Sequence, residues 1–196
     1  LSFIFSIDWE LQHLREEIIP ELERKARLAT RLMLREIRKG VGLEKVISQE
    51  SISGGTTTIV SELATYTNER GQRIVAFFDH LKTPTGDEPF VVVPPGYGET
   101  KRDGLSVAYY LVKNGFNVIR YDATDHIGES DGEIVNTTLS GAKNDLVATL
   151  NYLESHFGIS HVGVVASSLA KRVAIKAAAE DRRIVLLIGL VGGVGF

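Results

Sequence analysis

The sequence contains no cysteine, which excludes disulfide bonds and metal sites built from thiolates. It also lacks the run of roughly 20 apolar residues that a membrane-spanning helix needs, because its longest apolar stretch, residues 184–196, is shorter and rich in glycine. Residues 1–5 have neither the basic start nor the cleavage pattern of a secretory signal. These absences predict a cytoplasmic chain without a membrane span.

A strong charge of either sign is missing too, since the formal net charge is -3 at pH 7. Nucleic-acid-binding proteins usually carry a basic surface with aromatic side chains among the basic ones, a pattern that this chain does not follow. Its His, Asp and Glu residues are not spaced like the ligands of a metal site. The glycines of residues 189–195 follow a predicted strand but precede no helix, unlike a dinucleotide-binding motif. We expect no nucleic-acid partner, no metal and no cofactor.

What the sequence does contain is enough apolar material for a core, 43% of its 196 residues. Two strands are predicted at 56–60 and 71–78, and from residue 90 onward strands and helices alternate. The later strands are expected at 90–93, 116–121, 162–165 and 184–191, and the helices at 104–114, 139–157 and 170–180. This order predicts an α/β fold with a mainly parallel sheet and helices on both faces, truncated before its last strands.

The first 50 residues differ from the rest. Apolar residues recur at helical spacing between residues 8 and 39, which predicts an amphipathic helix that kinks or restarts at Pro20. Beside the apolar stripe runs a basic one that consists of Arg24, Arg27, Arg31, Arg35 and Arg38. Such a stripe is either a solvated face or a docking surface for an acidic partner. We expect 1–50 to be a helical segment or linker and 51–196 to be the N-terminal part of an α/β-hydrolase domain.

A candidate catalytic serine lies where the strand at 162–165 meets the next helix. Ser168 has alanine two residues before it, Ala166, and two residues after it, Ala170. A serine with small flanking residues at a strand-to-helix turn is typical of a nucleophile elbow, because neighbouring elements crowd this turn. We therefore predict Ser168 as the nucleophile.

A second serine, Ser130, matches the Gly-x-Ser-x-Gly pattern literally in residues 128–132. It lies several residues beyond a strand, in a polar loop, and no helix starts at it. We expect Gly128 and Gly132 to form a tight loop there. Ser130 therefore lacks the structural context of a nucleophile.

An acyl-transfer serine needs backbone N–H groups that bind the oxyanion. One is expected from Leu169, the residue after the nucleophile, and the other from the loop after the strand at 90–93. In that loop Gly96 and Gly98 allow unusual backbone angles and so support the backbone N–H of Tyr97, which we predict as the second donor.

Three segments resemble the acyl-transferases of bacterial bioluminescence: residues 114–122 (Asn-Gly-Phe-Asn-Val-Ile-Arg-Tyr-Asp), the loop 126–132, and residues 165–169 (Val-Ala-Ser-Ser-Leu). Members of that family are α/β-hydrolase-fold thioesterases that release myristate from acyl carrier protein. The resemblance implies an acyl-Ser168 intermediate, a fatty-acyl thioester substrate and an acyl carrier protein as its donor. The family often has a second serine where this chain has Ala170.

The base that Ser168 requires is not evident among the five histidines of the sequence. His126 follows a strand at the expected carboxyl edge of the sheet, but this fold places its catalytic acid and histidine after the serine. We expect both beyond residue 196, so that residues 1–196 alone are inactive. Two alternatives stay open, namely an esterase for another substrate class and a non-catalytic docking or scaffold module. The sequence does not predict the oligomeric state.

Overall fold

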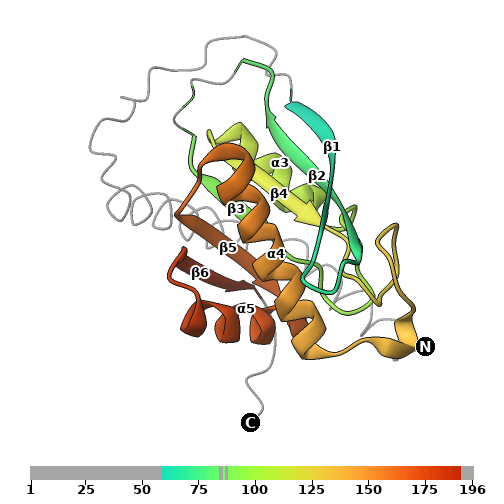
Figure 1. Cartoon of the computed structure of the whole chain (residues 1–196). Coiled ribbons are helices and arrows are strands. Elements are labelled where there is room, and N and C mark those ends of the chain that lie inside the picture. Colours follow the sequence, from blue (N-terminus) through green and yellow to red (C-terminus); the bar gives the residue numbers. More distant parts are fainter. Residues whose placement is uncertain (1–58, 84–85, 87, 191–196) are drawn as a thin grey trace, which may run out of the picture. The chain divides into compact units, whose positions relative to one another are not determined.

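The computed structural model describes residues 59–83, 86 and 88–190, and the predictions for residues 1–58 and 191–196 lie outside this part of the chain. The described residues form a six-stranded sheet in the order β1-β2-β4-β3-β5-β6 (Figure 1). Its strands are β1 (Ile59–Thr67), β2 (Arg73–Leu81), β3 (Phe90–Val93), β4 (Asn117–Tyr121), β5 (Val162–Ser167) and β6 (Ile184–Leu190). The helices are α3 (Leu105–Lys113), the short 3-10 helix η2 (Ile134–Asn136), α4 (Leu139–Phe157) and α5 (Ser168–Glu180).

The sheet is mainly parallel, as predicted. Strands β4, β3, β5 and β6 run parallel to one another, whereas β1 pairs antiparallel with β2, and β2 pairs antiparallel with β4. Four-residue β3 is buried along its whole length. A short, wholly apolar strand between two parallel neighbours must be covered on both faces, which the helices achieve.

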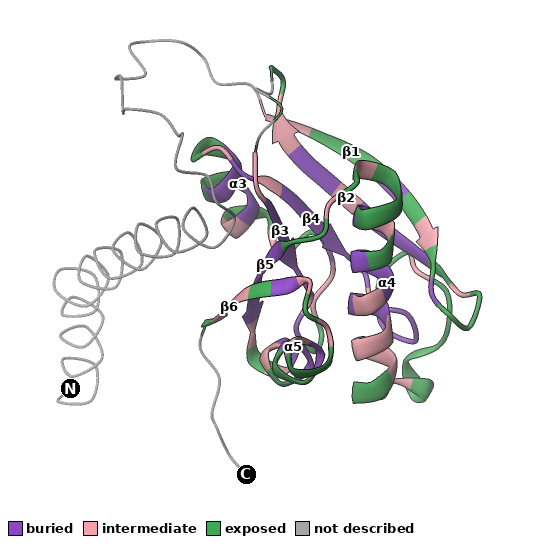
Figure 2. Cartoon of the chain, turned by 60° about the vertical axis from the view of Figure 1, so that its left-hand side comes forward, coloured by how far each residue is buried: buried purple, intermediate pink, exposed green. Residues whose placement is uncertain are grey.

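Helices cover both faces of the sheet, with α3 on one side and α4 and α5 on the other (Figure 2). Alternate residues of each strand point to opposite faces. On β3, for example, Val92 belongs to the core cluster that contains Leu146 and Leu150 of α4 and Ala174 of α5. This face holds the larger apolar core.

Helix α4 has the bounds that its periodicity predicted. Thr138 accepts a hydrogen bond from the Gly141 amide at 3.0 Å and so caps the first turn. Gly158 ends the helix at φ +70°, a left-handed conformation that favours glycine. Both boundaries therefore have a local cause.

The first two strands extend beyond their predicted ends. Strand β1 continues to Thr67. Sequence patterning left its later residues unassigned because β1 is an edge strand with an exposed outer side. Strand β2 continues to Leu81 through Asp79, whose buried carboxylate pairs with Arg120 of β4 at 2.6 Å. This long-range partner makes a charged residue tolerable inside the sheet.

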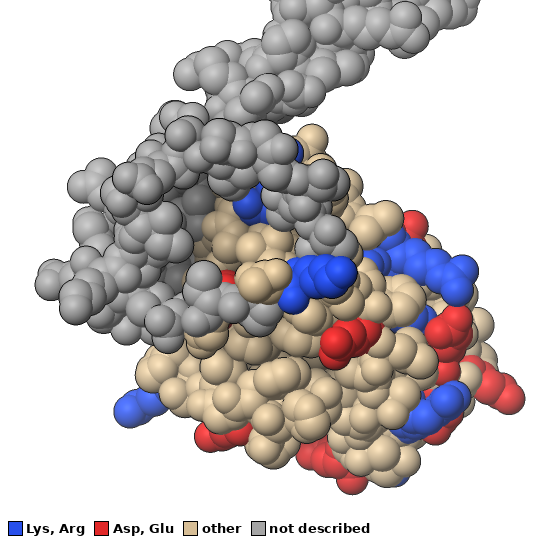
Figure 3. All heavy atoms as spheres, turned by 90° about the horizontal axis from the view of Figure 1, so that it is seen from above, with Lys and Arg blue, Asp and Glu red and all other residues tan. Residues whose placement is uncertain are grey.

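Seen from above the view of Figure 1, the described surface carries Lys and Arg side chains interspersed with Asp and Glu (Figure 3). Within the described ranges, no helix combines the length and apolar character required to cross a membrane.

Candidate active site

The strand order creates a crevice at the carboxyl ends of β3 and β5. These neighbouring parallel strands continue into helices on opposite faces of the sheet, β3 toward α3 and β5 into α5. Loops that leave adjacent strands in opposite directions open a ligand site between them. A cavity of about 300 Å³ lies here, lined by residues of the loops after β3 and β4, of α4 and of the start of α5.

Ser168 occupies the turn between β5 and α5. Its φ of +48° places it in the left-handed region, which side chains other than glycine rarely adopt. Such strain at a strand-to-helix turn characterises a nucleophile elbow, because it lifts the hydroxyl out of the sheet. Ser168 is exposed, and its hydroxyl has no hydrogen-bond partner among the described residues. The hydroxyl is thus accessible to a substrate.

The small flanking residues have the packing role that the sequence suggested. Ala166 is fully buried in β5, and Ala170 in the first turn of α5 is 3% exposed. Both belong to the core cluster between the sheet and α4. A larger side chain at either position would overpack the turn that holds Ser168.

The N-terminus of α5 brings the backbone amide of Leu169 to the edge of the cavity. The N-cap residue, Ser167, makes no side-chain hydrogen bond to the first turn. The first amides of a helix have no intrahelical partner and carry partial positive charge. Leu169 also lines the cavity, so its N–H group is suited to an anion there.

The loop after β3 leaves one amide for a ligand. The Gly96 N–H donates to Glu99 Oε2 at 2.7 Å, the Gly98 N–H to His126 Nε2 at 3.1 Å, and the Glu99 N–H to the Gly96 carbonyl at 3.1 Å. The Tyr97 N–H has no partner among the described residues. Tyr97 lines the same cavity as Leu169.

The two loop glycines have different structural roles. Gly98 has a φ of +78°, as the prediction of unusual backbone angles requires. Gly96 does not have a positive φ, and there the requirement is space, because a Cβ would lie 2.7 Å from Glu99 Oε2. An alanine at Gly96 would displace the carboxylate that holds its own amide.

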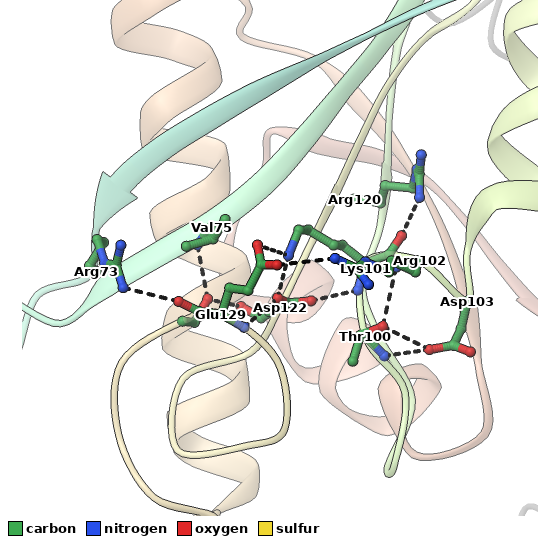
Figure 4. Close-up of polar contacts among 10 residues, drawn as sticks. Arg73, Val75, Thr100, Lys101, Arg102, Asp103, Arg120, Asp122 and Glu129 are labelled. Carbon is green, nitrogen blue, oxygen red and sulfur yellow. Dashed lines mark hydrogen bonds and ion pairs between the residues drawn. The ribbon is translucent and has the colours of Figure 1, made fainter.

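Two interlocked loops support the site, and sequence reasoning missed this connection. The Lys101 amide and its ammonium group each donate to the buried Asp122 carboxylate at 2.6 Å, and the ammonium also contacts Glu129 at 2.8 Å (Figure 4). Lys101 therefore lowers the pKa of Glu129, chiefly by its hydrogen bond. Arg120 donates to the Lys101 carbonyl. These residues lie far apart in sequence, so no local pattern could have revealed their pairing.

The hydroxyl of Ser130 is occupied by two hydrogen bonds to the backbone. Its hydroxyl accepts from the Val75 amide at 2.9 Å and donates to the Asp122 carbonyl at 2.7 Å. Gly128 and Gly132 adopt φ values of +129° and +106°, and a Cβ on either would collide with an aspartate of the same loop. The Gly-x-Ser-x-Gly match thus marks a tight loop pinned to β2.

His126 lines the cavity but offers no lone pair to Ser168. Its Nε2 accepts the hydrogen bond of Gly98, so in the neutral imidazole the proton is on Nδ1. The other described histidines lie elsewhere. His80 stacks on Phe78, His156 lies in the last turn of α4, and His161 precedes β5. No described histidine is hydrogen-bonded to Ser168.

The sequence profile of a family described as Acyl transferase matches residues 63–196. An acyl transferase of Photobacterium phosphoreum is 39% identical over 104 residues, which cover 53% of this chain and 34% of that protein. An acyl transferase of Vibrio harveyi is 33% identical over 115 residues, 57% of this chain and 37% of that protein. The matched part of the chain thus spans about a third of the length of these curated relatives.

Solved structures resemble the chain in fold. A hypothetical protein, PA2218, from Pseudomonas aeruginosa superimposes with a TM-score of 0.63 at 20% identity, over 76% of this chain and 48% of that one. The α/β hydrolase GrgF from Penicillium sp. sh18 gives a TM-score of 0.61 at 19% identity, over 68% and 46% of the two chains. At this identity, the two structures indicate the fold alone, which is that of the α/β hydrolases.

Proposed function

The chain belongs to the acyl transferase family, and on that basis we propose that Ser168 is the nucleophile of a serine hydrolase or acyltransferase that acts on fatty-acyl thioesters. The observation that carries this proposal is the left-handed turn at Ser168, φ +48°, beside a cavity to which the start of α5 and the loop after β3 bring the Leu169 and Tyr97 amides. A strained serine next to paired amide donors suits acyl transfer.

The proposed chemistry proceeds in two steps. A base removes the proton of the Ser168 hydroxyl as its Oγ attacks the thioester carbonyl carbon, and the negative charge that forms on the carbonyl oxygen is bound by the Tyr97 and Leu169 amides. The C–S bond then breaks, and the thiolate leaves with a proton. Water or another acceptor attacks acyl-Ser168, releases the acyl group and returns the proton to Oγ. A histidine and a carboxylate outside the described residues would supply the base and orient it.

The lining of the cavity supports an acyl substrate. It is mostly apolar and includes Tyr121, Leu139 and Val173. Ile134 and Leu139, both about half exposed, extend this apolar surface toward solvent. A hydrocarbon chain gains free energy by leaving water for such a surface, about 0.8 kcal/mol for each buried CH₂ group. We propose a fatty-acyl group, delivered as a thioester of acyl carrier protein.

Intact-mass measurement of the full natural chain tests this proposal. After incubation with a long-chain acyl thioester, we expect the mass to rise by one acyl group in the wild type and in Ser130→Ala, but not in Ser168→Ala. Ser130→Ala is the matched control because it removes the hydroxyl of the literal Gly-x-Ser-x-Gly match. An adduct that persists in Ser168→Ala contradicts the proposed nucleophile.

Two other functions give different outcomes in the same system. An esterase of another substrate class would also need Ser168, but it would show no preference for long acyl chains over short ones. A non-catalytic docking or scaffold module would form no adduct and would fail to react with a fluorophosphonate probe. Rates for thioesters of graded chain length, combined with probe labelling, therefore distinguish the three functions.

A further inference from the structure

We propose that His126 is a positioning residue that fixes the oxyanion loop, defined here as residues 96–99, so that the Tyr97 N–H points at the developing oxyanion. This inference rests on the proposed function of Ser168 and adds a role for a histidine that is not the base. The hydrogen bonds that other side chains make with the amides of this loop support the proposed role.

The Tyr97 N–H lies between two peptide units that are each held by a side chain. The unit before it ends in the Gly96 N–H, which Glu99 Oε2 binds at 2.7 Å. The unit after it ends in the Gly98 N–H, which His126 Nε2 binds at 3.1 Å. With both neighbouring units fixed, the dihedral angles on either side of the Tyr97 amide are restricted. Such preorganisation gives an oxyanion donor its effect, because no reorientation is needed during the reaction.

His126 is held by packing and by its one hydrogen bond to Gly98, because its buried Nδ1 has no hydrogen-bond partner among the described residues. Its side chain is buried, with the residue 8% exposed, and its ring packs edge-on against the Tyr97 ring at a centroid distance of 5.3 Å. The preceding residue, Asp125, has a φ of +54° and is fixed by Arg70 at 3.0 Å and by Gln72 at 3.1 Å. The buried imidazole therefore acts as an acceptor that connects the loop after β4 to the oxyanion loop.

Only an acceptor at the position of Nε2 can do this, which defines a matched pair of substitutions. His126→Phe keeps a ring that can pack against Tyr97 but removes the acceptor. His126→Gln loses the ring but places a carbonyl oxygen near the former Nε2. If His126 served packing alone, the Phe variant would be the milder of the two. If it positions the loop, the Gln variant would be the milder.

The test is steady-state kinetics of the full natural chain with a long-chain acyl thioester, normalised to the fraction of Ser168 that reacts with a fluorophosphonate probe. Complete loss of an oxyanion donor lowers kcat by about 10²- to 10³-fold. A misdirected donor should have a smaller effect, about 10- to 100-fold for His126→Phe, with KM within about twofold. We expect His126→Gln to restore most of kcat. Wild-type kcat in His126→Phe, or a lower kcat in His126→Gln than in His126→Phe, would overturn the inference.

A second measurement is independent of the chemistry at Ser168. Hydrogen exchange at the Gly98 amide should be faster in His126→Phe than in the wild type and slow again in His126→Gln. Unchanged exchange in His126→Phe would refute the hydrogen bond's role, even if Ser168→Ala abolishes the acyl adduct. Conversely, an adduct that survives in Ser168→Ala overturns the proposed function, while the exchange data still report on the loop. The two failures are thus distinguishable.

Discussion

Asp145 lies on α4, and its fully buried carboxylate accepts hydrogen bonds from three donor groups. The Thr124 amide donates to it at 2.7 Å, the Thr124 hydroxyl at 2.9 Å and the Asn68 side chain at 2.9 Å. Burial nevertheless raises the pKa of Asp145 above its ordinary value of 3.8, because loss of hydration outweighs these bonds. The folded protein therefore holds this proton to a higher pH than the unfolded chain does.

The raised pKa of Asp145 determines whether this residue's contribution to stability rises or falls with pH. Between pH 3.8 and the raised folded pKa, the folded state binds more protons at Asp145, so this residue's contribution to stability falls as the pH rises. In Asp145→Asn nothing titrates at this position. The free energy of unfolding of the wild type minus that of Asp145→Asn should fall by at most about 1.4 kcal/mol per pH unit in this window and be flat above it. Urea unfolding at pH 4 to 7 measures the difference, and a rise with pH would contradict the prediction.

At the scale of elements, one buried ion pair is among the bonds that hold the loop after β3 against the loop after β4. Lys101 and Asp122 have side chains that are 1% and 0% exposed. Lys101→Met leaves the Asp122 carboxylate buried without a cation, which typically costs about 3–5 kcal/mol. In Lys101→Met/Asp122→Asn no unpaired charge remains, so the double variant should unfold at a higher urea concentration than Lys101→Met alone. Additive losses in the two single variants would show that the pair is not coupled.

The elements that could be predicted from sequence are those whose boundaries have local causes. Helix α4 has a capping threonine and a terminal glycine, and the buried strand β3 has an unbroken apolar run between turns. The full length of β2 depends on the Asp79–Arg120 pair, whose partners come from different strands. No periodicity shows such a pair, so the prediction stopped at residue 78.

The residues of the candidate site also fall into two groups, those with a local sequence pattern and those that depend on a distant partner. Ser168, Leu169 and Tyr97 could be proposed from sequence because each lies at a fixed offset from the end of a strand, and their catalytic roles stay proposals. Lys101 and His126 act through bonds to residues on another loop, 21 and 28 positions away. Sequence placed His126 at the correct edge of the sheet but suggested only a weak alternative base. The bond to Gly98 became evident from the three-dimensional arrangement.

For the whole molecule, the fold and the family resemblance predicted from residues 114–122, 126–132 and 165–169 are confirmed by the match to the acyl transferase family and by the α/β-hydrolase structures. The assignment of residues 1–50 as a helical segment stays a prediction. The thioester substrate and the carrier protein stay proposals.

The cavity at the carboxyl ends of β3 and β5 gives a prediction for the whole fold. A long-chain fatty acid at 100 times its dissociation constant should stabilise the full natural chain by about 2.7 kcal/mol, because only the folded state binds it. Ala142→Trp places a large ring at a position that lines the cavity and should abolish this gain. Asn151→Trp, at an exposed position on the same helix, is the matched control. Thermal unfolding with and without fatty acid measures the effect, and full stabilisation of Ala142→Trp would place the ligand elsewhere.

The left-handed conformation of Ser168 bears on the history of the gene. A non-glycine residue held there costs about 1–3 kcal/mol, whereas glycine adopts the same angles freely. Selection for a stable fold alone would therefore favour glycine at this position, and only selection for the chemistry of the hydroxyl opposes that drift. A lineage that keeps the fold as a passive scaffold should lose the serine, while a lineage that keeps it is still under selection for what the serine does.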